Sequence, residues 1–192
     1  MTRSASEVTL RGERVTLRPV RPADADHLEE ILAEPEVRRW WGEHDADRVR
    51  RELIEEDDAV VYAIEVAGEL IGSVQYGEET TPDYRHASMD IFLATAWQGQ
   101  GLGTEALRVL ARHLFEERGH HRLTIDPAAA NERAIRAYEQ VGFRPVGVMR
   151  EYERGDDGSW HDGLLMDLLA SEFLARPTRP SSAGGRSART SA

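Results

Sequence analysis

A glycine-rich segment between an apolar run and an amphipathic pattern most constrains the fold of this chain. The apolar run Met89–Leu93 precedes residues Gln98–Thr104, which read Gln-Gly-Gln-Gly-Leu-Gly-Thr. Apolar residues then recur with the period of one helix face, at Leu107, Leu110, Ala111 and Leu114. Glycines let a backbone approach a ligand closely, and the first turn of a helix presents unpaired N–H groups. The pattern therefore predicts a strand, a turn and a helix whose N-terminus can bind a phosphate or pyrophosphate.

Two better-known phosphate-binding motifs do not fit this segment. It lacks the Lys-Ser/Thr ending of a nucleotide triphosphate loop, and its glycines do not have the G-x-G-x-x-G spacing of dinucleotide-binding proteins. What remains is Q-x-x-G-x-G. Taken alone, this pattern is equally typical of a glycine-rich turn without a ligand, so other parts of the chain must decide.

Composition excludes several classes of function. The chain has 192 residues, no cysteine, and 24 basic against 35 acidic residues, a formal net charge of −11. Disulfides and thiolate chemistry are excluded, the histidines lack metal-ligand spacing, and we expect no metal site. Such an acidic protein is a poor partner for nucleic acid but favours a cationic substrate, although acidity can also simply aid solubility.

The absence of a signal-peptide pattern and of a membrane-length apolar run predicts a cytoplasmic protein without a membrane partner. Both a monomer and a homodimer are compatible with the sequence. Residues 8–175 are expected to form one domain, and residues 176–192, rich in Pro, Ser, Gly and Arg, a disordered tail.

Hydrophobic patterning predicts an α/β fold with a central mixed sheet and helices on both of its faces. A first helix is expected to end at Pro35. The glycine-rich turn follows a central strand at its carboxyl end, where open α/β sheets place their ligands. The expected strands are 14–18, 60–66, 69–76, 86–93, 122–125, 143–149 and 163–169, with a polar loop between the last two. The expected helices are 24–33, 48–56, 101–118 and 131–141.

A second motif, Asn131–Phe143, reads N-x-x-A-x-x-x-Y-x-x-x-G-F. Together with Q-x-x-G-x-G it resembles the GCN5-related N-acetyltransferase (GNAT) superfamily, over roughly Val15 to Leu169. The resemblance implies the GNAT acyl-CoA N-acyltransferase fold and acetyl-CoA as the acyl donor. It also implies that Leu93 offers a backbone N–H to the thioester carbonyl and that Asn131 contacts the pantetheine arm. The implied pyrophosphate loop comprises Gln98, Gly99, Gln100, Gly101, Leu102, Gly103 and Thr104.

Acetyl transfer to an amine requires a base for the amine, a donor for the carbonyl oxygen and an acid for the departing thiolate. By resemblance Tyr138 is the acid, although it also lies on an apolar helix stripe where a packed tyrosine is ordinary. Asp90 lies in an otherwise apolar strand, where a carboxylate must be paired, wet or functional. It is either the base or a residue of a solvated face. Asp126 is a second candidate base, or the first residue of an Asp-Pro turn.

Within the superfamily the chain is most similar to the aminoglycoside 6′-N-acetyltransferases that confer antibiotic resistance. Val37–Gly42, Gly101–Thr104 and Asp126–Pro127 carry this similarity. It implies that Asp90 acts at the transferred amine, and that Asp126 contacts the drug. Trp40 and Trp41 are implied to lie near the substrate, or else to anchor helix packing. Glu78, Glu79 and Asp83 either line the entrance of the same substrate cleft or are solvated charges of a loop.

Three alternatives remain open at this stage. A ribosomal-protein or peptide N-terminal acetyltransferase would use the same coenzyme loop for a different acceptor. A siderophore-type lysine N-acyltransferase would do the same. An acetyl-CoA-binding regulatory domain would bind the coenzyme without turnover.

Overall fold

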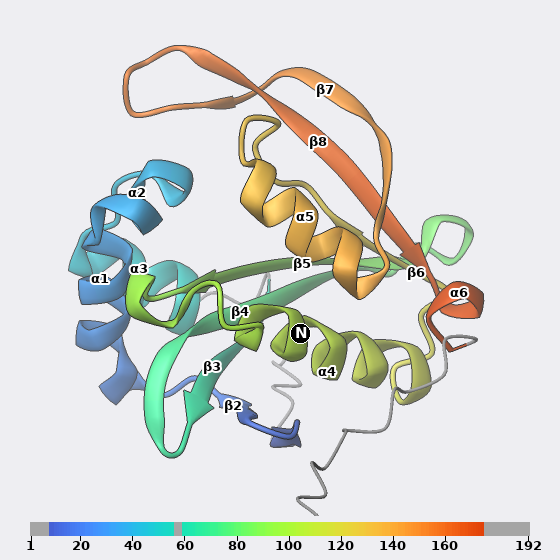
Figure 1. Cartoon of the computed structure of the whole chain (residues 1–192), viewed down its shortest axis with the longest axis horizontal. Helices are drawn as coiled ribbons and strands as arrows, with labels where there is room; N and C mark the ends of the chain where they lie inside the picture. Colours follow the sequence, from blue (N-terminus) through green and yellow to red (C-terminus); the bar gives the residue numbers. More distant parts are fainter. Residues whose placement is uncertain (1–7, 56–58, 175–192) are drawn as a thin grey trace, which may run out of the picture.

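The computed structural model describes residues 8–55 and 59–174, which form one mixed sheet with helices on both of its faces (Figure 1). The predicted fold class is confirmed. The expected tail at 176–192 lies outside the described residues. The strands are β1 Leu10–Arg11, β2 Val15–Pro19, β3 Val60–Val66, β4 Glu69–Glu79, β5 His86–Leu93, β6 Arg122–Ile125, β7 Arg144–Arg154 and β8 Trp160–Leu169. The helices are α1 Ala25–Ala33, α2 Pro35–Trp41, α3 Ala46–Val49, α4 Leu102–Glu116, α5 Glu132–Val141 and α6 Ala170–Leu174, with a π-helical turn at Arg50–Glu55.

The strand order is β1-β2-β3-β4-β5-β6-β8-β7, and neighbours within the described sheet are antiparallel except at β5–β6. The parallel pair is short, because only Ala87–Leu123 and Ser88–Thr124 are in register. On its other side β5 stays paired with β4 as far as the Gly72–Leu93 pair. The last residues of β5 therefore have a neighbouring strand on one edge only, and the sheet opens between β5 and β6.

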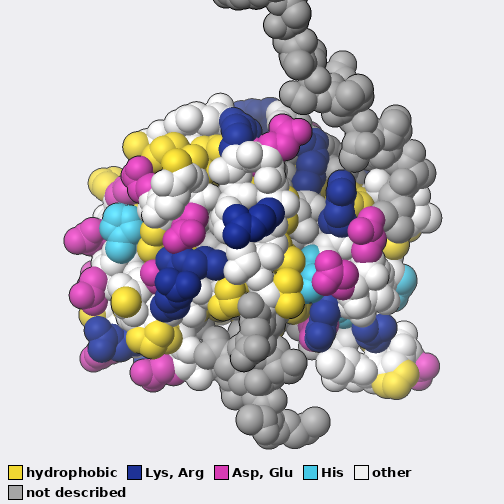
Figure 2. Space-filling view, turned by 90° about the horizontal axis from the view of Figure 1, so that it is seen from below, with side chains coloured by type: hydrophobic (Ala, Val, Ile, Leu, Met, Phe, Trp, Pro, Cys, Tyr) yellow, Lys and Arg dark blue, Asp and Glu magenta, His cyan; other side chains and the backbone are white. Residues whose placement is uncertain are grey.

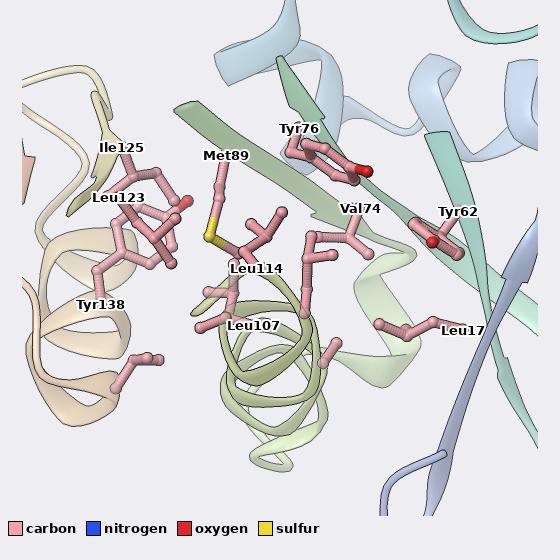
Figure 3. Packing of buried hydrophobic residues seen from close by; sticks show 14 of the residues in the cluster. Leu17, Tyr62, Val74, Tyr76, Met89, Leu107, Leu114, Leu123, Ile125 and Tyr138 are labelled. Carbon is pink, nitrogen blue, oxygen red and sulfur yellow. The ribbon is translucent and has the colours of Figure 1, made fainter. Parts of the chain in front are cut away.

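Alternation along the strands divides the core between the two faces of the sheet. Tyr62 and Leu93 belong to the larger buried cluster, which includes the apolar sides of α4 and α5. Val61 and Phe92, each one residue away, belong to the second cluster with α1, α2 and the π-helical turn. Figure 3 shows part of the larger cluster, where Leu107 and Leu114 of α4 lie below Met89 of β5.

Glycine and asparagine fix the starts of the two central helices. Gly99 and Gly101 have φ of +74° and +78°, which other residues adopt only at a cost, so the turn before α4 depends on them. Arg14 braces this turn, because its Nη1 donates to the Gln100 carbonyl at 3.0 Å. Asn131 is the N-cap of α5, and its Oδ1 accepts from the Ala134 N–H at 3.1 Å.

The predicted end of the first helix before Pro35 is confirmed, because α1 ends at Ala33. Pro35 then begins α2, where its missing N–H costs nothing because first-turn N–H groups have no helical partner. Two other expectations about individual elements were wrong. The expected helix at 48–56 is instead the short α3 followed by a π-helical turn. Strands β7 and β8 extend well beyond 143–149 and 163–169 and form a long hairpin, where a polar loop was expected.

Two surface properties bear on the partners of this chain. No helix within residues 8–55 and 59–174 is long and apolar enough to cross a membrane. On the face in Figure 2 acidic and basic side chains are interspersed, so the negative charge is not concentrated there.

The close approach of β4 and β5 at Gly72 predicts a large cost for adding a side chain. A Cβ at Gly72 would lie 2.2 Å from the Phe92 carbonyl oxygen and 2.9 Å from Leu93 Cα, at φ of +156°. We expect Gly72→Ala to lower the free energy of unfolding by roughly 2–4 kcal/mol. Gly68→Ala is the matched control, because Gly68 also has positive φ but no atom within 4 Å of its Cβ. It should cost only about 1 kcal/mol. Equal losses in urea titrations would contradict the close approach.

Candidate active site

A cleft of about 690 Å³ opens where β5 and β6 separate. One wall comes from α2 and the segment after it, and the other comes from α5 and β7. Its floor is formed by the end of β5, and one end is closed by the glycine-rich turn and the first residues of α4. The cleft therefore joins a helix N-terminus to a region rich in carboxylates and aromatic rings.

The glycine-rich turn forms the first end of this cleft. Five of the seven loop candidates line it: Gln98, Gly99, Gly101, Gly103 and Thr104. A Cβ at Gly99 would meet no atom within 4 Å, so open space adjoins the backbone there. The side chains of the other two loop candidates point elsewhere: Leu102 is 3% exposed in the core, and Gln100 Nε2 donates to the Ala96 carbonyl at 2.8 Å. These two residues can contribute backbone groups to a ligand, but not side chains.

The backbone at the end of β5 faces the cleft. Ala94 N–H donates toward β4, to the Ile71 carbonyl at 2.9 Å. Because peptide groups alternate along a strand, the N–H and C=O of Leu93 point to the opposite edge, where β6 has separated. Gln98, also in the cleft, donates from Nε2 to the Leu93 carbonyl at 2.7 Å, which holds this peptide in place.

Tyr138 reaches from α5 toward Leu123 and Ile125 of β6 (Figure 3). It is 7% exposed and lines the cleft. Burial raises the pKa of its hydroxyl far above the usual range, and the negative charges of Asp90 and Asp126 raise it further. The hydroxyl is therefore protonated at every physiological pH and can act as a proton donor.

Side chains alternate along β5, so Asp90 lies on the same face as Phe92 and not on the face that packs against α4. On that face Asp90 lines the cleft. Its Oδ1 accepts from the Ile91 N–H at 2.9 Å. The carboxyl is open to water in the cleft, yet the surrounding walls restrict its solvation. That desolvation, with smaller contributions from the charges of Asp126 and Glu153, raises its pKa to about 7.

Asp126 follows β6 and completes an acidic cluster in the cleft. Burial raises the pKa of Asp126, whereas a hydrogen bond donated by the Tyr152 hydroxyl opposes that rise. The same hydrogen bond, together with partial burial, raises the pKa of Tyr152 to about 12. Glu153 also lines the cleft, and the charges of Asp126 and Glu153 both act on Asp90, so these three carboxylates share one part of it.

The tryptophan pair lies on the opposite wall, and both rings line the cleft. Trp41 also packs edge-to-face against Phe92, with ring centroids 4.9 Å apart. The sequence left open whether Trp41 anchors a helix or lies near the substrate. In the structure it anchors α2 to the sheet and also lines the cleft. The Arg39 guanidinium lies over the ring of Trp40, 4.8 Å from its centroid.

His44 lies beyond the tryptophans, with a side chain 4% exposed. Its Nε2 is 3.5 Å from a Glu52 oxygen, and Arg48 Nε donates to the other Glu52 oxygen at 2.8 Å. Burial, and then the charge of Arg48, lower the pKa of His44. The imidazole is therefore neutral at physiological pH, and it adds no positive charge to this wall.

Comparison with known proteins gives the family. The family model of the acetyltransferase (GNAT) domain matches residues 14–144. The chain belongs to the GNAT acetyltransferase family. It is 32% identical over 164 residues to the aminoglycoside N(6′)-acetyltransferase type 1 of Klebsiella pneumoniae, covering 75% of this chain and 81% of that protein.

Other relatives of this acetyltransferase have different names. A putative ribosomal N-acetyltransferase of Bacillus subtilis is 28% identical, with 86% of this chain and 93% of that protein covered. The spermidine N(1)-acetyltransferase of Escherichia coli is 24% identical, with 86% and 91% covered. The solved structure of AAC(6′)-Ib with paromomycin and acetyl-CoA has a TM-score of 0.73 and 26% identity, covering 86% of this chain and 99% of that chain.

Tyr152, Glu153 and His44 are among the cleft residues of this acetyltransferase that the sequence did not predict. Tyr152 and Glu153 fall where a polar loop was expected; the alternation of β7 could have predicted a longer strand there, but not that it borders the cleft. His44 had no local signal. Conversely, none of Glu78, Glu79 and Asp83 lines the cleft. The Glu78 carboxylate, for example, is held by Arg118 at 2.8 Å and His120 at 2.7 Å.

The Tyr152–Asp126 hydrogen bond can be tested by titration. In Tyr152→Phe the donor is lost, so burial acts on Asp126 unopposed and we expect the pKa of Asp126 to rise further. Carboxyl NMR titration of Asp126 measures this directly. Tyr84→Phe is the control, because Tyr84 is 73% exposed and does not line the cleft. An Asp126 pKa that stays constant or falls in Tyr152→Phe would exclude the hydrogen bond.

Proposed function

We propose that this acetyltransferase moves an acetyl group from acetyl-CoA to a primary amine of a polycationic acceptor, most specifically the 6′-amino group of an aminoglycoside. The observation that carries the proposal is the single cleft that joins a glycine-lined helix N-terminus to three carboxylates and a buried tyrosine. The antibiotic-resistance role and the cytoplasmic location predicted from the sequence belong to the same proposal.

The cleft fits acetyl-CoA in two respects. The α4 N-terminus, with open space beside Gly99, offers backbone N–H donors to a pyrophosphate. The free edge of β5 offers the Leu93 N–H to an acyl carbonyl. Acetyl-CoA supplies an activated thioester whose acetyl group can pass to an amine. Asn131 lines the cleft between these two regions, but its Oδ1 is already engaged in capping α5, so only its amide NH₂ remains for the pantetheine arm.

Asp90 is the proposed base. Only the ionised carboxylate can accept a proton from an ammonium, and a pKa of about 7 lets Asp90 both accept a proton and release it near neutral pH. Asp126 already accepts a hydrogen bond from Tyr152. We therefore assign Asp126 a role in holding the acceptor and not that of the base.

Tyr138 is the proposed acid. Its raised pKa keeps the hydroxyl protonated before the reaction, so its proton is available to the thiolate that departs from the coenzyme. Because it lies between Asp90 and Asp126, a lasting tyrosinate there would be repelled, so Tyr138 must regain its proton before the next turnover.

The acceptor side suits an aminoglycoside because carboxylates pair with ammonium groups and the tryptophan rings offer faces to a sugar or a cation. The relative from Klebsiella pneumoniae supports this acceptor. The same carboxylates would also pair with a linear polyamine, and the spermidine N(1)-acetyltransferase relative makes spermidine the second candidate. A ribosomal peptide N-terminus is the third, supported by the relative from Bacillus subtilis.

A matched pair of acceptors tests the proposed substrate. We expect thiol release from acetyl-CoA with kanamycin and tobramycin, which carry a 6′-amine, and none with an aminoglycoside that has a hydroxyl there. The reason is that only an amine becomes a nucleophile after losing one proton to a carboxylate. Spermidine and an N-terminal ribosomal peptide complete the panel. Turnover restricted to either of them would overturn the aminoglycoside assignment while leaving amine acetylation in place.

The pH dependence tests the base. Because Asp90 acts as a carboxylate with a pKa of about 7, kcat/KM should fall as the pH drops through that value. Asp90→Asn should lower kcat/KM at neutral pH by roughly 100- to 10,000-fold and remove this limb of the profile. Tyr138→Phe is the comparison, because it should lower kcat and keep the limb. An Asp90→Asn enzyme with the wild-type profile would exclude Asp90 as the base.

A further inference from the structure

The two walls of the acceptor side come from segments far apart in the chain. Glu36, Trp40 and Trp41 lie on α2, whereas Tyr152 and Glu153 lie near the end of β7. The β7–β8 hairpin extends from the sheet toward α2 (Figure 1). The width of the acceptor side therefore depends on what holds the hairpin relative to α2.

Asp156, at the hairpin tip, makes the connection. Its Oδ1 accepts from the Glu43 N–H at 3.3 Å, and its Oδ2 lies 3.7 Å from Arg38 Nε. Arg38 in turn pairs with the Glu43 carboxylate at 3.2 Å. A Cβ added at Gly42 would lie 3.2 Å from the same Oδ1, so the hairpin tip is in contact with the C-terminus of α2.

The β7–β8 hairpin also has an irregularity between the sheet and the Asp156 contact at its tip. The β7–β8 register shifts between Met149 and Glu153, and Glu151 there has φ of +50°. An irregularity of this kind bends and twists a strand. Tyr152 and Glu153 thus lie between a bend on one side and the Asp156 contact on the other.

We propose that Asp156 is a positioning residue that fixes the hairpin across the acceptor side, and thereby sets which amines the enzyme prefers. Arg38 and Asp156 are 46% and 51% exposed, so their pairing is a weak, salt-sensitive surface interaction and not a support of the core. It can hold Tyr152 and Glu153 at a set distance from the tryptophan wall. An acceptor that touches both walls benefits from this, whereas a small monoamine at Asp90 does not.

This inference rests on the proposed function, and a KM comparison tests it. In Asp156→Ala the KM for kanamycin should rise about two- to fivefold, the effect expected for loss of one exposed ion pair. The KM for acetyl-CoA, and kcat/KM for a monoamino sugar, should stay at their wild-type values. The difference from wild type should shrink at high ionic strength, because salt screens the pair.

Asp157→Ala is the matched control. Asp157 accepts from the Ser159 N–H at 2.9 Å and lies 3.3 Å from His161 Nε2, contacts that stay within the hairpin. It should keep the wild-type KM for kanamycin. Arg38→Ala should raise the KM for kanamycin in the same direction but by less, because it removes the ion pair and leaves the Glu43 N–H bond to Asp156. The double variant should match Asp156→Ala, because the ion pair is already lost in that single variant.

Equal KM values for kanamycin in Asp156→Ala and Asp157→Ala would overturn the proposal, as would a matching rise in the KM for acetyl-CoA. The wild-type enzyme reports separately on the proposed function. If it does not acetylate kanamycin, the aminoglycoside assignment fails, and the same variants are compared on spermidine against the monoamine. A selective rise in the KM for spermidine would then support the role of Asp156, and its absence would overturn it.

Discussion

The separation of β6 from β5 beyond Ser88 and Thr124 is the constraint on which the rest of the structure depends. A strand edge inside a protein must satisfy its peptide groups in another way. Asp90 does so for the Ile91 N–H, and Gln98 for the Leu93 carbonyl. The opening therefore places the Asp90 carboxylate, the Gln98 amide and the backbone of Leu93 along one edge of β5, while β4 stays paired with the other edge.

The carboxylates within this opening repel one another, and a bound cation would reduce that repulsion. Desolvation raises the pKa values of Asp90 and Asp126, and Tyr138 is held neutral between them. Like charges in a restricted volume repel, and an ammonium placed among them would restore the ionised carboxylates. The negative charges that attract an ammonium also favour its protonated form. Removal of its proton is favoured instead by the raised pKa of Asp90, about 7, which makes this carboxylate a stronger base than an ordinary aspartate.

The two ends of the cleft have different origins in the chain. The end proposed for the coenzyme is continuous in sequence, formed by the end of β5, the glycine-rich turn and α4. The end proposed for the acceptor is assembled from α2, the residue after β6 and the β7–β8 hairpin. A change in the segments of the acceptor end can therefore alter that end without altering the sequence of the first end.

Features that depend on neighbouring residues could be predicted from the sequence. The ranges 60–66, 86–93 and 122–125 were predicted as strands with the bounds that the structure has, since alternation and turn residues are local signals. The glycine-rich turn and the start of α5 at Asn131 were equally local. That Tyr152 and Glu153 border the cleft, and that Asp156 meets Glu43, depends instead on contacts between segments far apart in the chain. Those outcomes depend on how the β7–β8 hairpin bends over a sheet formed by distant residues, and no local pattern encodes that bend.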